Sequence, residues 1–240
     1  MAEKEAPVRP PWGLGAAGVA FAVALIGGAI GSSIAIALGA GQKSIGLTVG
    51  GLLGEWLGFI GVPVVLSFTR GTHSLVRDFG LRLAGWRDVA LGLAAGVGTN
   101  VVVLALIYPP FLWLLSQIAG HTVKVGNAAK QLGAEGRGIG FVVFALCVAV
   151  GAPVAEELFF RGLLQRSLQR WLPGLSGIIV AATLFGLAHV GSTELAALPA
   201  LIVFGIVLGL LYDRTGRLGP GIVAHMAFNA ITVAQLAISR

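Results

Sequence analysis

The chain has 240 residues, of which 56% are hydrophobic and 11% are charged, against about 25% charged residues in an average soluble domain. Its mean hydropathy of +0.92 excludes an ordinary soluble globular protein and indicates an integral membrane protein. The formal net charge of +6 does not indicate nucleic-acid binding, because Lys and Arg mark cytoplasmic loops in membrane proteins and no basic helix with interleaved aromatic residues occurs. The single cysteine, Cys147, excludes an intrachain disulfide and a thiolate metal cluster.

The amino-terminal half predicts a short tail followed by membrane spans. Residues 1–12 are polar and contain three prolines, so we expect a disordered cytoplasmic tail there. Because no repeat and no long linker divides the rest, residues 13–240 are expected to form one transmembrane domain. The first two spans are predicted at 13–40 and about 47–68. Glu55 interrupts the second span, and without an accompanying motif we interpret it as a carboxyl near a helix end or hydrogen-bonded inside the bundle.

The next segments set the expected topology. Residues 69–88 form the most basic loop, and a third span follows at about 89–116, where Pro109 and Pro110 are expected to kink or end the helix. Residues 117–138 form a polar, glycine-rich link. With the amino terminus inside, most of the 16 Lys and Arg residues fall on the cytoplasmic side, so this orientation is favoured.

Four more spans complete the predicted fold: about 139–170, 174–190, 195–212 and 218–237. We therefore expect an all-α, polytopic membrane helix bundle with about seven transmembrane helices, eight being the alternative count. Two adjacent carboxylates, Glu156 and Glu157, fall inside the fourth span. A charge near the middle of a membrane helix costs at least ~2.5 kcal/mol on insertion scales, so the pair indicates a functional site.

Helical geometry predicts partners for these carboxylates. If the fourth and fifth helices form a hairpin that turns at 172–174, Glu156 and His189 are each about 25 Å from the turn and lie at the same depth. Glu157 and Arg161 are four residues apart in the favourable order for a helical ion pair. Glu156 lies about 100° around the helix from Glu157 and is free to face the bundle interior as a general base.

The last helix adds His225 and Asn229, which lie four residues apart on one face. Their N–H groups could stabilise the oxyanion of a tetrahedral intermediate, typically worth ~3 kcal/mol per donor. Alternatively, Glu156, His189 and His225 could bind a divalent metal such as zinc. Each residue taken singly is better explained as an interhelical hydrogen bond, but their joint occurrence on neighbouring spans favours a site. The absence of His-Glu-x-x-His excludes an ordinary zincin helix.

Three ordered motifs on late membrane helices resemble the CPBP family of CAAX proteases and bacteriocin-processing enzymes: Glu156-Glu157-x-x-x-Arg161, Phe185-x-x-x-His189 and His225-x-x-x-Asn229. The match covers about residues 139–235, which would be the catalytic core. The resemblance implies an intramembrane endopeptidase with a helical fold and a cavity open to the cytosol. It also implies that Glu157 and Arg161 support the site.

For the remaining motif residues, the resemblance implies that Glu156 and His189 activate water and that His225 and Asn229 form the oxyanion hole. Direct water activation is favoured over a zinc-dependent mechanism. The Gly- and Ala-rich composition, with Arg in excess of Lys, is typical of a high-GC bacterium. We therefore expect a protein of the bacterial inner membrane that cleaves a peptide or membrane protein rather than a prenylated protein. The alternative is a non-catalytic membrane scaffold or bacteriocin self-immunity protein that retains the motifs as a folding core. No pattern indicates an oligomeric state.

Overall fold

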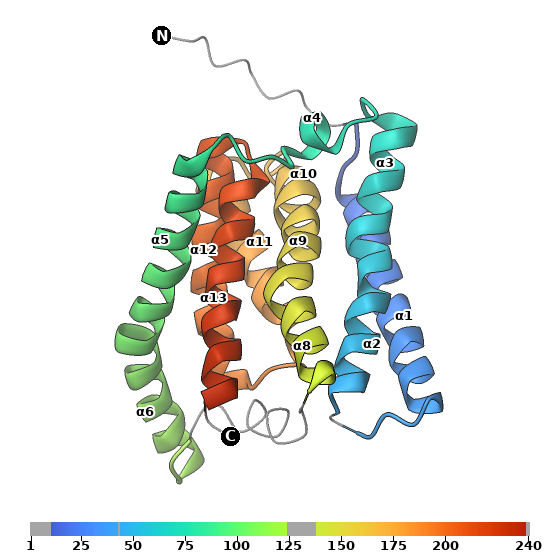
Figure 1. The fold of residues 1–240 in the computed structure, drawn as a ribbon. Coiled ribbons are helices and arrows are strands. Elements are labelled where there is room, and N and C mark those ends of the chain that lie inside the picture. Colours follow the sequence, from blue (N-terminus) through green and yellow to red (C-terminus); the bar gives the residue numbers. More distant parts are fainter. Residues whose placement is uncertain (1–10, 43, 124–137, 239–240) are drawn as a thin grey trace.

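A computed structural model of the chain describes residues 11–42, 44–123 and 138–238 (Figure 1). Within these ranges the backbone is helical with no β-strand, apart from an isolated bridge between Val190 and Thr193. The first half comprises α1 (Leu14–Ala37), α2 (Ile45–Trp56), η1 (Leu57–Gly61), α3 (Val62–Arg70), α4 (Leu75–Phe79), α5 (Trp86–Val102), η2 (Val103–Ile107) and α6 (Tyr108–Ala119). The second half comprises α8 (Ile139–Leu146), η3 (Cys147–Gly151), α9 (Ala152–Glu157), η4 (Leu158–Gln165), α10 (Arg166–Leu168), α11 (Leu175–Ala188), η5 (Leu195–Ala197), α12 (Leu198–Thr215) and α13 (Leu218–Ile238).

Most of these elements join into long apolar helices. Five continuous stretches are long and apolar enough to cross a membrane, judged by length and composition: Leu14–Ala37, Ile45–Arg70, Trp86–Ala119, Ile139–Leu168 and Leu195–Thr215. The apolar helix α11 has 14 residues, and α13 has 21. These helices coincide with the seven segments in which spans were predicted, and the prediction of an all-α, polytopic bundle is confirmed.

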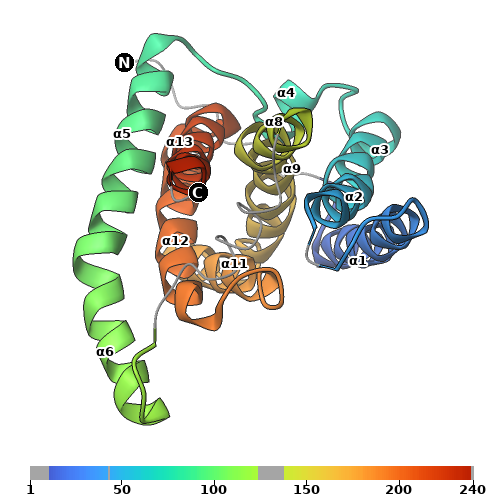
Figure 2. The same cartoon turned by 60° about the horizontal axis from the view of Figure 1, so that its bottom comes forward.

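The bundle has three parts. Helices α1 to α3 lie on one side of the continuous helix α8–α10, and α5–α6 lies along the opposite side next to α13 (Figure 1). Turning the molecule shows α12 and α13 between α5 and the α8–α10 helix, with α11 beside α12 (Figure 2). The α8–α10 helix therefore contacts elements from both halves of the chain.

Three of the long helices contain a π-helical segment directly before a proline. The segments η1, η2 and η3 end two residues before Pro63, Pro109 and Pro153, respectively. Proline has no N–H and its ring clashes with the carbonyl four residues earlier, and a local π-turn relieves both problems inside a membrane helix. Of the two outcomes expected at Pro109 and Pro110, an end of the third span is wrong, because the widened turn lets the helix continue to Ala119; a kink there stays a prediction.

Helices α1 and α2 pack backbone to backbone through glycines. A Cβ atom on Gly54 would clash with the carbonyl of Gly27, and one on Gly31 would clash with the carbonyl of Gly50. Small residues permit this close approach, which supplies van der Waals contact where lipid provides no hydrophobic drive. The two helices thus form one rigid wall facing α9.

The end of the bundle that holds α4 is closed by polar and aromatic contacts. The Asp78 carboxylate accepts hydrogen bonds from the Ser67 hydroxyl (2.6 Å) and from the Thr72 backbone N–H (3.0 Å) and hydroxyl (2.9 Å). Burial alone would raise the pKa of Asp78, but these hydrogen bonds to the charged form outweigh it and lower the pKa below its usual value. Trp12 stacks on Phe79 at 4.8 Å between ring centroids and is buried.

Trp12 also corrects the predicted tail. Its carbonyl accepts a hydrogen bond from Arg170 (2.7 Å), so residue 12 belongs to the packed domain rather than to a disordered segment. Residues 1–10 lie outside the described part of the chain, and their disorder stays a prediction. The start of α13 is fixed at the same end, because the N–H groups of Leu218 and Gly219 donate to the carbonyls of Gly80 and Arg82.

Candidate active site

The two adjacent glutamates of α9 face different surroundings. Glu157 is completely buried, whereas 13% of the Glu156 side chain remains exposed. They end α9 immediately before the π-helical segment η4, and π-turns occur frequently at functional sites. The predicted divergence of the two carboxylates is therefore present in the structure.

Two donors contact one oxygen of Glu157, Oε1. Its Oε1 accepts a hydrogen bond from Arg161 Nη1 (2.9 Å) and lies 3.0 Å from His225 Nδ1. Arg161 is also buried, donates to the Gly205 carbonyl (3.2 Å) and stacks over the Phe185 ring at 4.5 Å from its centroid. The predicted Glu157–Arg161 pair is present. The contact with His225 was missed, because no spacing within one helix could relate α9 to α13.

Glu156 is the point on which two imidazoles converge. The Nε2 atoms of His189 and His225 each lie 3.8 Å from Glu156 Oε2, which is buried and has no hydrogen-bond partner among the described residues. The equal depth of Glu156 and His189 is thus present. Both distances exceed hydrogen-bond length, so the three groups surround a common point without binding one another.

A hydrogen bond at Nδ1 of each imidazole determines where its hydrogens lie. His189 Nδ1 lies 2.8 Å from the Phe185 carbonyl, which can only accept, so Nδ1 carries the hydrogen and Nε2 of the neutral ring is an acceptor. His225 Nδ1 likewise donates to Glu157. A hydrogen on His225 Nε2 therefore requires the doubly protonated, cationic ring.

Phe185 holds both rings in place. Its ring contacts His189 edge to face at 4.8 Å between centroids and His225 at 5.7 Å. It is fully buried, in agreement with its interpretation as a packing residue rather than a reactive one. Replacing it with a smaller side chain would free both imidazoles to rotate.

Asn229 is on the same face of α13 as His225, as predicted, but one of its amide hydrogens is already used. Its Nδ2 donates to the Val148 carbonyl (2.9 Å) in the π-helical segment η3. An amide group has two donor hydrogens, so one remains after this bond. The amide is thereby fixed between α13 and the helix that bears Glu156.

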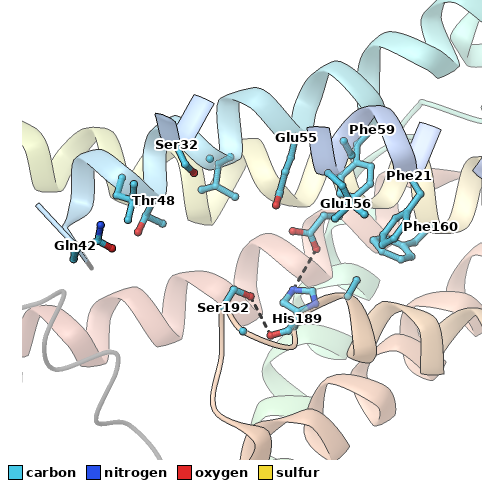
Figure 3. Close-up of a pocket in the computed structure, with 17 residues that line it drawn as sticks. Phe21, Ser32, Gln42, Thr48, Glu55, Phe59, Glu156, Phe160, His189 and Ser192 are labelled. Atoms are coloured by element: carbon cyan, nitrogen blue, oxygen red, sulfur yellow. Dashed lines mark hydrogen bonds and ion pairs between the residues drawn. The ribbon is translucent and has the colours of Figure 1, made fainter. Parts of the chain in front are cut away.

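A cavity of about 570 Å³ lies beside Glu156 between the α1–α2 wall and α11 (Figure 3). Its apolar walls include Phe21, Phe59 and Phe160. Glu55 lines the same cavity and lies one residue before the end of α2, and among the described residues it makes no hydrogen bond inside the bundle. Sequence reasoning discounted Glu55 because no motif surrounds it; the signal that could have found it was its charge within a span.

The cavity lies toward the end of the bundle that is opposite α4 (Figure 1). From Glu156 it extends toward Thr48, Gln42 and Ser192, near the links that follow α1 and α11 (Figure 3). At the other end, every residue of η4 is buried. The physical reason is that Phe79 of α4 and Leu218 of α13 pack against Gly162 and cover that side.

The side chains around Glu156 include possible metal ligands. Among the residues that the structure describes, no group of three or more His, Cys, Asp or Glu is arranged to hold a metal ion. Zinc binding by Glu156, His189 and His225 stays a prediction. The Nδ1 atoms of His189 and His225 are both engaged by protein oxygens, which orients each imidazole to bind a water or a metal ion through Nε2.

Comparisons with known proteins identify the family of the chain. Residues 138–231 match the family model described as type II CAAX prenyl endopeptidase Rce1-like. The chain is 30% identical over 162 residues to the uncharacterized protein YpbD of Bacillus subtilis (strain 168), covering 67% of this chain and 76% of that relative. The chain belongs to the CPBP family. All six motif residues named above as catalytic or supporting lie within the matched stretch of this CPBP protein.

A second CPBP relative is the UPF0177 protein YaiH of Lactococcus lactis subsp. lactis (strain IL1403), which is 30% identical over 140 residues, 55% of this chain and 52% of that relative. No solved structure matches the chain. Membership in the CPBP family, together with the apolar helices, identifies a multi-pass membrane protein and, at the level of the family, a CAAX-type intramembrane protease.

Proposed function

We propose that this protein is an endopeptidase that hydrolyses a peptide bond with water activated by Glu156 and His189. The observation that supports this most is the convergence of two Nε2 atoms on the unpartnered Oε2 of Glu156, each at 3.8 Å. Glu156 Oε2 and His189 Nε2 are both acceptors, so a water between them can donate one hydrogen to each. Its oxygen lone pair then points away from both, toward a substrate carbonyl.

In the proposed reaction, the water oxygen attacks the carbonyl carbon while Glu156 takes the water proton as general base. The carbonyl oxygen becomes an oxyanion, stabilised by the remaining amide hydrogen of Asn229 and by Nε2–H of cationic His225. When the tetrahedral intermediate collapses, the C–N bond breaks and Glu156 returns its proton to the leaving amine. Glu157 and Arg161 act by positioning His225.

We further propose a peptide or membrane-protein substrate and a bacterial inner-membrane location with the amino terminus inside. The basic loop 69–88 lies at the α4 end of the bundle (Figure 1), and Arg170 donates to the Trp12 carbonyl at the same end, which supports placing that end in the cytoplasm. Because the cavity extends toward the opposite end, the proposed orientation implies that the substrate enters from the extracytoplasmic side. This differs from the cytosolic opening that the family resemblance implied.

The proposed function is tested with Glu156→Gln, which keeps the size of the side chain but removes the base. Peptides in membranes from cells with the intact protein are compared with those from cells with the variant by mass spectrometry. We expect the cleavage products to disappear, since loss of a general base typically lowers the rate about 10²–10⁴-fold. Asp213→Asn, at an exposed carboxylate far from the cavity, is the matched control. A Glu156→Gln protein that accumulates normally and still yields the products would refute the proposal.

A further inference from the structure

Glu55 is the one carboxylate of the cavity that the proposed mechanism does not use. It projects from α2 into the cavity that also contains Glu156 and His189, so that Glu55 and His189 approach Glu156 from opposite sides (Figure 3). Among the described residues it makes no hydrogen bond and no ion pair. Its carboxylate is therefore available to whatever occupies the cavity.

The neighbouring helix α1 makes room for this side chain. A Cβ atom on Gly28 of α1 would lie 2.9 Å from Glu55 Cγ and 3.5 Å from its Oε1. With glycine there, the stem of Glu55 lies against α1 and its head stays in the cavity. Gly28→Ala would push the carboxylate aside without removing its charge.

The charged side chains in the described lining of the cavity are all acidic. Its described lining contains two carboxylates, Glu55 and Glu156, but no Lys or Arg, and His189 is its only basic side chain. Glu157 shows the contrast, because Arg161 and His225 both face it. A charge in an apolar site is costly unless it is paired, and a cavity with one sign of charge attracts ligands of the opposite sign.

We propose that Glu55 recognises a cationic group of the substrate, an ammonium or guanidinium, held in the cavity next to the scissile bond. The rings of Phe21, Phe59 and Phe160 line the same space and favour a cation through their π faces. The cation comes either from a Lys or Arg side chain or from a free amino terminus. Glu55 is thus a specificity residue of the proposed protease, and this inference rests on the proposed function.

The first experiment measures binding without cleavage. The thermal stability of the purified protein in detergent is followed with 2-phenylethylammonium and with its neutral analogue 2-phenylethanol. We expect the cation, but not the alcohol, to raise the melting temperature, and Glu55→Gln to remove this difference while Asp213→Asn retains it. Equal shifts with the two probes, or a cation-specific shift that survives Glu55→Gln, would overturn the inference whether or not the protein is a protease.

The second experiment measures cleavage rates in proteoliposomes with four quenched fluorescent peptides. The peptides have either Lys or Gln near the cleaved bond, and each of these two is made with a free and with an acetylated amino terminus. The intact protein should cleave at least one cationic form about tenfold faster than its neutral counterpart, since removing one member of a desolvated charge pair costs that much or more. Glu55→Gln should abolish this preference while cleavage continues, and Gly28→Ala should weaken it.

The outcomes separate the two claims. If Glu55→Gln removes the preference for the Lys over the Gln peptide, a side chain supplies the cation. If it removes the preference for a free over an acetylated amino terminus, the terminus supplies it. If Glu156→Gln abolishes cleavage but Glu55→Gln leaves the preference intact, the inference about Glu55 fails and the proposed function stands. If Glu156→Gln still cleaves, the proposed function fails, and cation binding by Glu55 is judged by the thermal shift alone.

Discussion

The buried charge of Arg161 permits a quantitative prediction. Arg161→Met keeps much of the side-chain volume but removes the partner of Glu157 at 2.9 Å, the donor to the Gly205 carbonyl and the cation over Phe185. Because Glu157 is completely buried, it would be left with His225 alone. Breaking a buried ion pair by removing one partner costs about 3–5 kcal/mol, so we expect a loss of this size in the free energy of unfolding.

The assay is unfolding of the purified protein by increasing SDS in mixed micelles, applied to the wild type, Arg161→Met, Glu157→Gln, the double variant Glu157→Gln/Arg161→Met and Arg214→Met. The double variant removes both charges and should be less destabilised than Arg161→Met, because no uncompensated carboxylate remains. Arg214 is exposed, so its replacement should change stability by less than about 0.5 kcal/mol. Two results would refute this account of the network: a free energy of unfolding for Arg161→Met within about 1 kcal/mol of the wild type, or a loss in the double variant equal to the sum of the losses in the two single variants.

Three further predictions concern packing, pH and topology. Gly54→Leu should separate α1 from α2 and destabilise the protein by at least about 1–3 kcal/mol in the same unfolding assay, and unchanged stability would contradict backbone-to-backbone packing. The pKa of Asp78 is lowered in the folded state, so its contribution to stability is present above its unfolded pKa and is lost as the pH falls through its folded pKa. Asp78→Asn should therefore lower the melting temperature at neutral pH and flatten its decline in acid, whereas parallel curves would contradict this. In a Cys147→Ala background, Ser192→Cys should react with an impermeant maleimide added outside intact cells and Arg77→Cys should not; the reverse pattern would contradict the proposed orientation.

Local rules were sufficient to predict much of the fold. The seven predicted segments coincide with helices because apolar length alone determines where a chain can cross a membrane. Spacing within one helix also sufficed for the Glu157–Arg161 pair, and symmetry about one short turn sufficed to bring Glu156 level with His189. These inferences need only the helical repeat, which the sequence determines.

Contacts between helices that are distant in the chain could not be predicted in this way. The bond from His225 to Glu157, the anchoring of Asn229 on Val148 and the position of Glu55 depend on how α2, α9 and α13 pack. The direction of the cavity was also missed, because it depends on α4, a five-residue helix in the basic loop, covering one end of the bundle. Charge in a loop indicates its side of the membrane, but not what it packs against.

The central claim is that Glu156 and His189 act on the same water, and a double-mutant cycle tests it most directly. Cleavage rates of the wild type, Glu156→Gln, His189→Gln and the double variant are measured in proteoliposomes at equal protein content. If both residues act as one unit, each single variant should lose most of the activity and the double variant should be no slower than Glu156→Gln. Full activity of His189→Gln, or losses that multiply in the double variant, would contradict the claim.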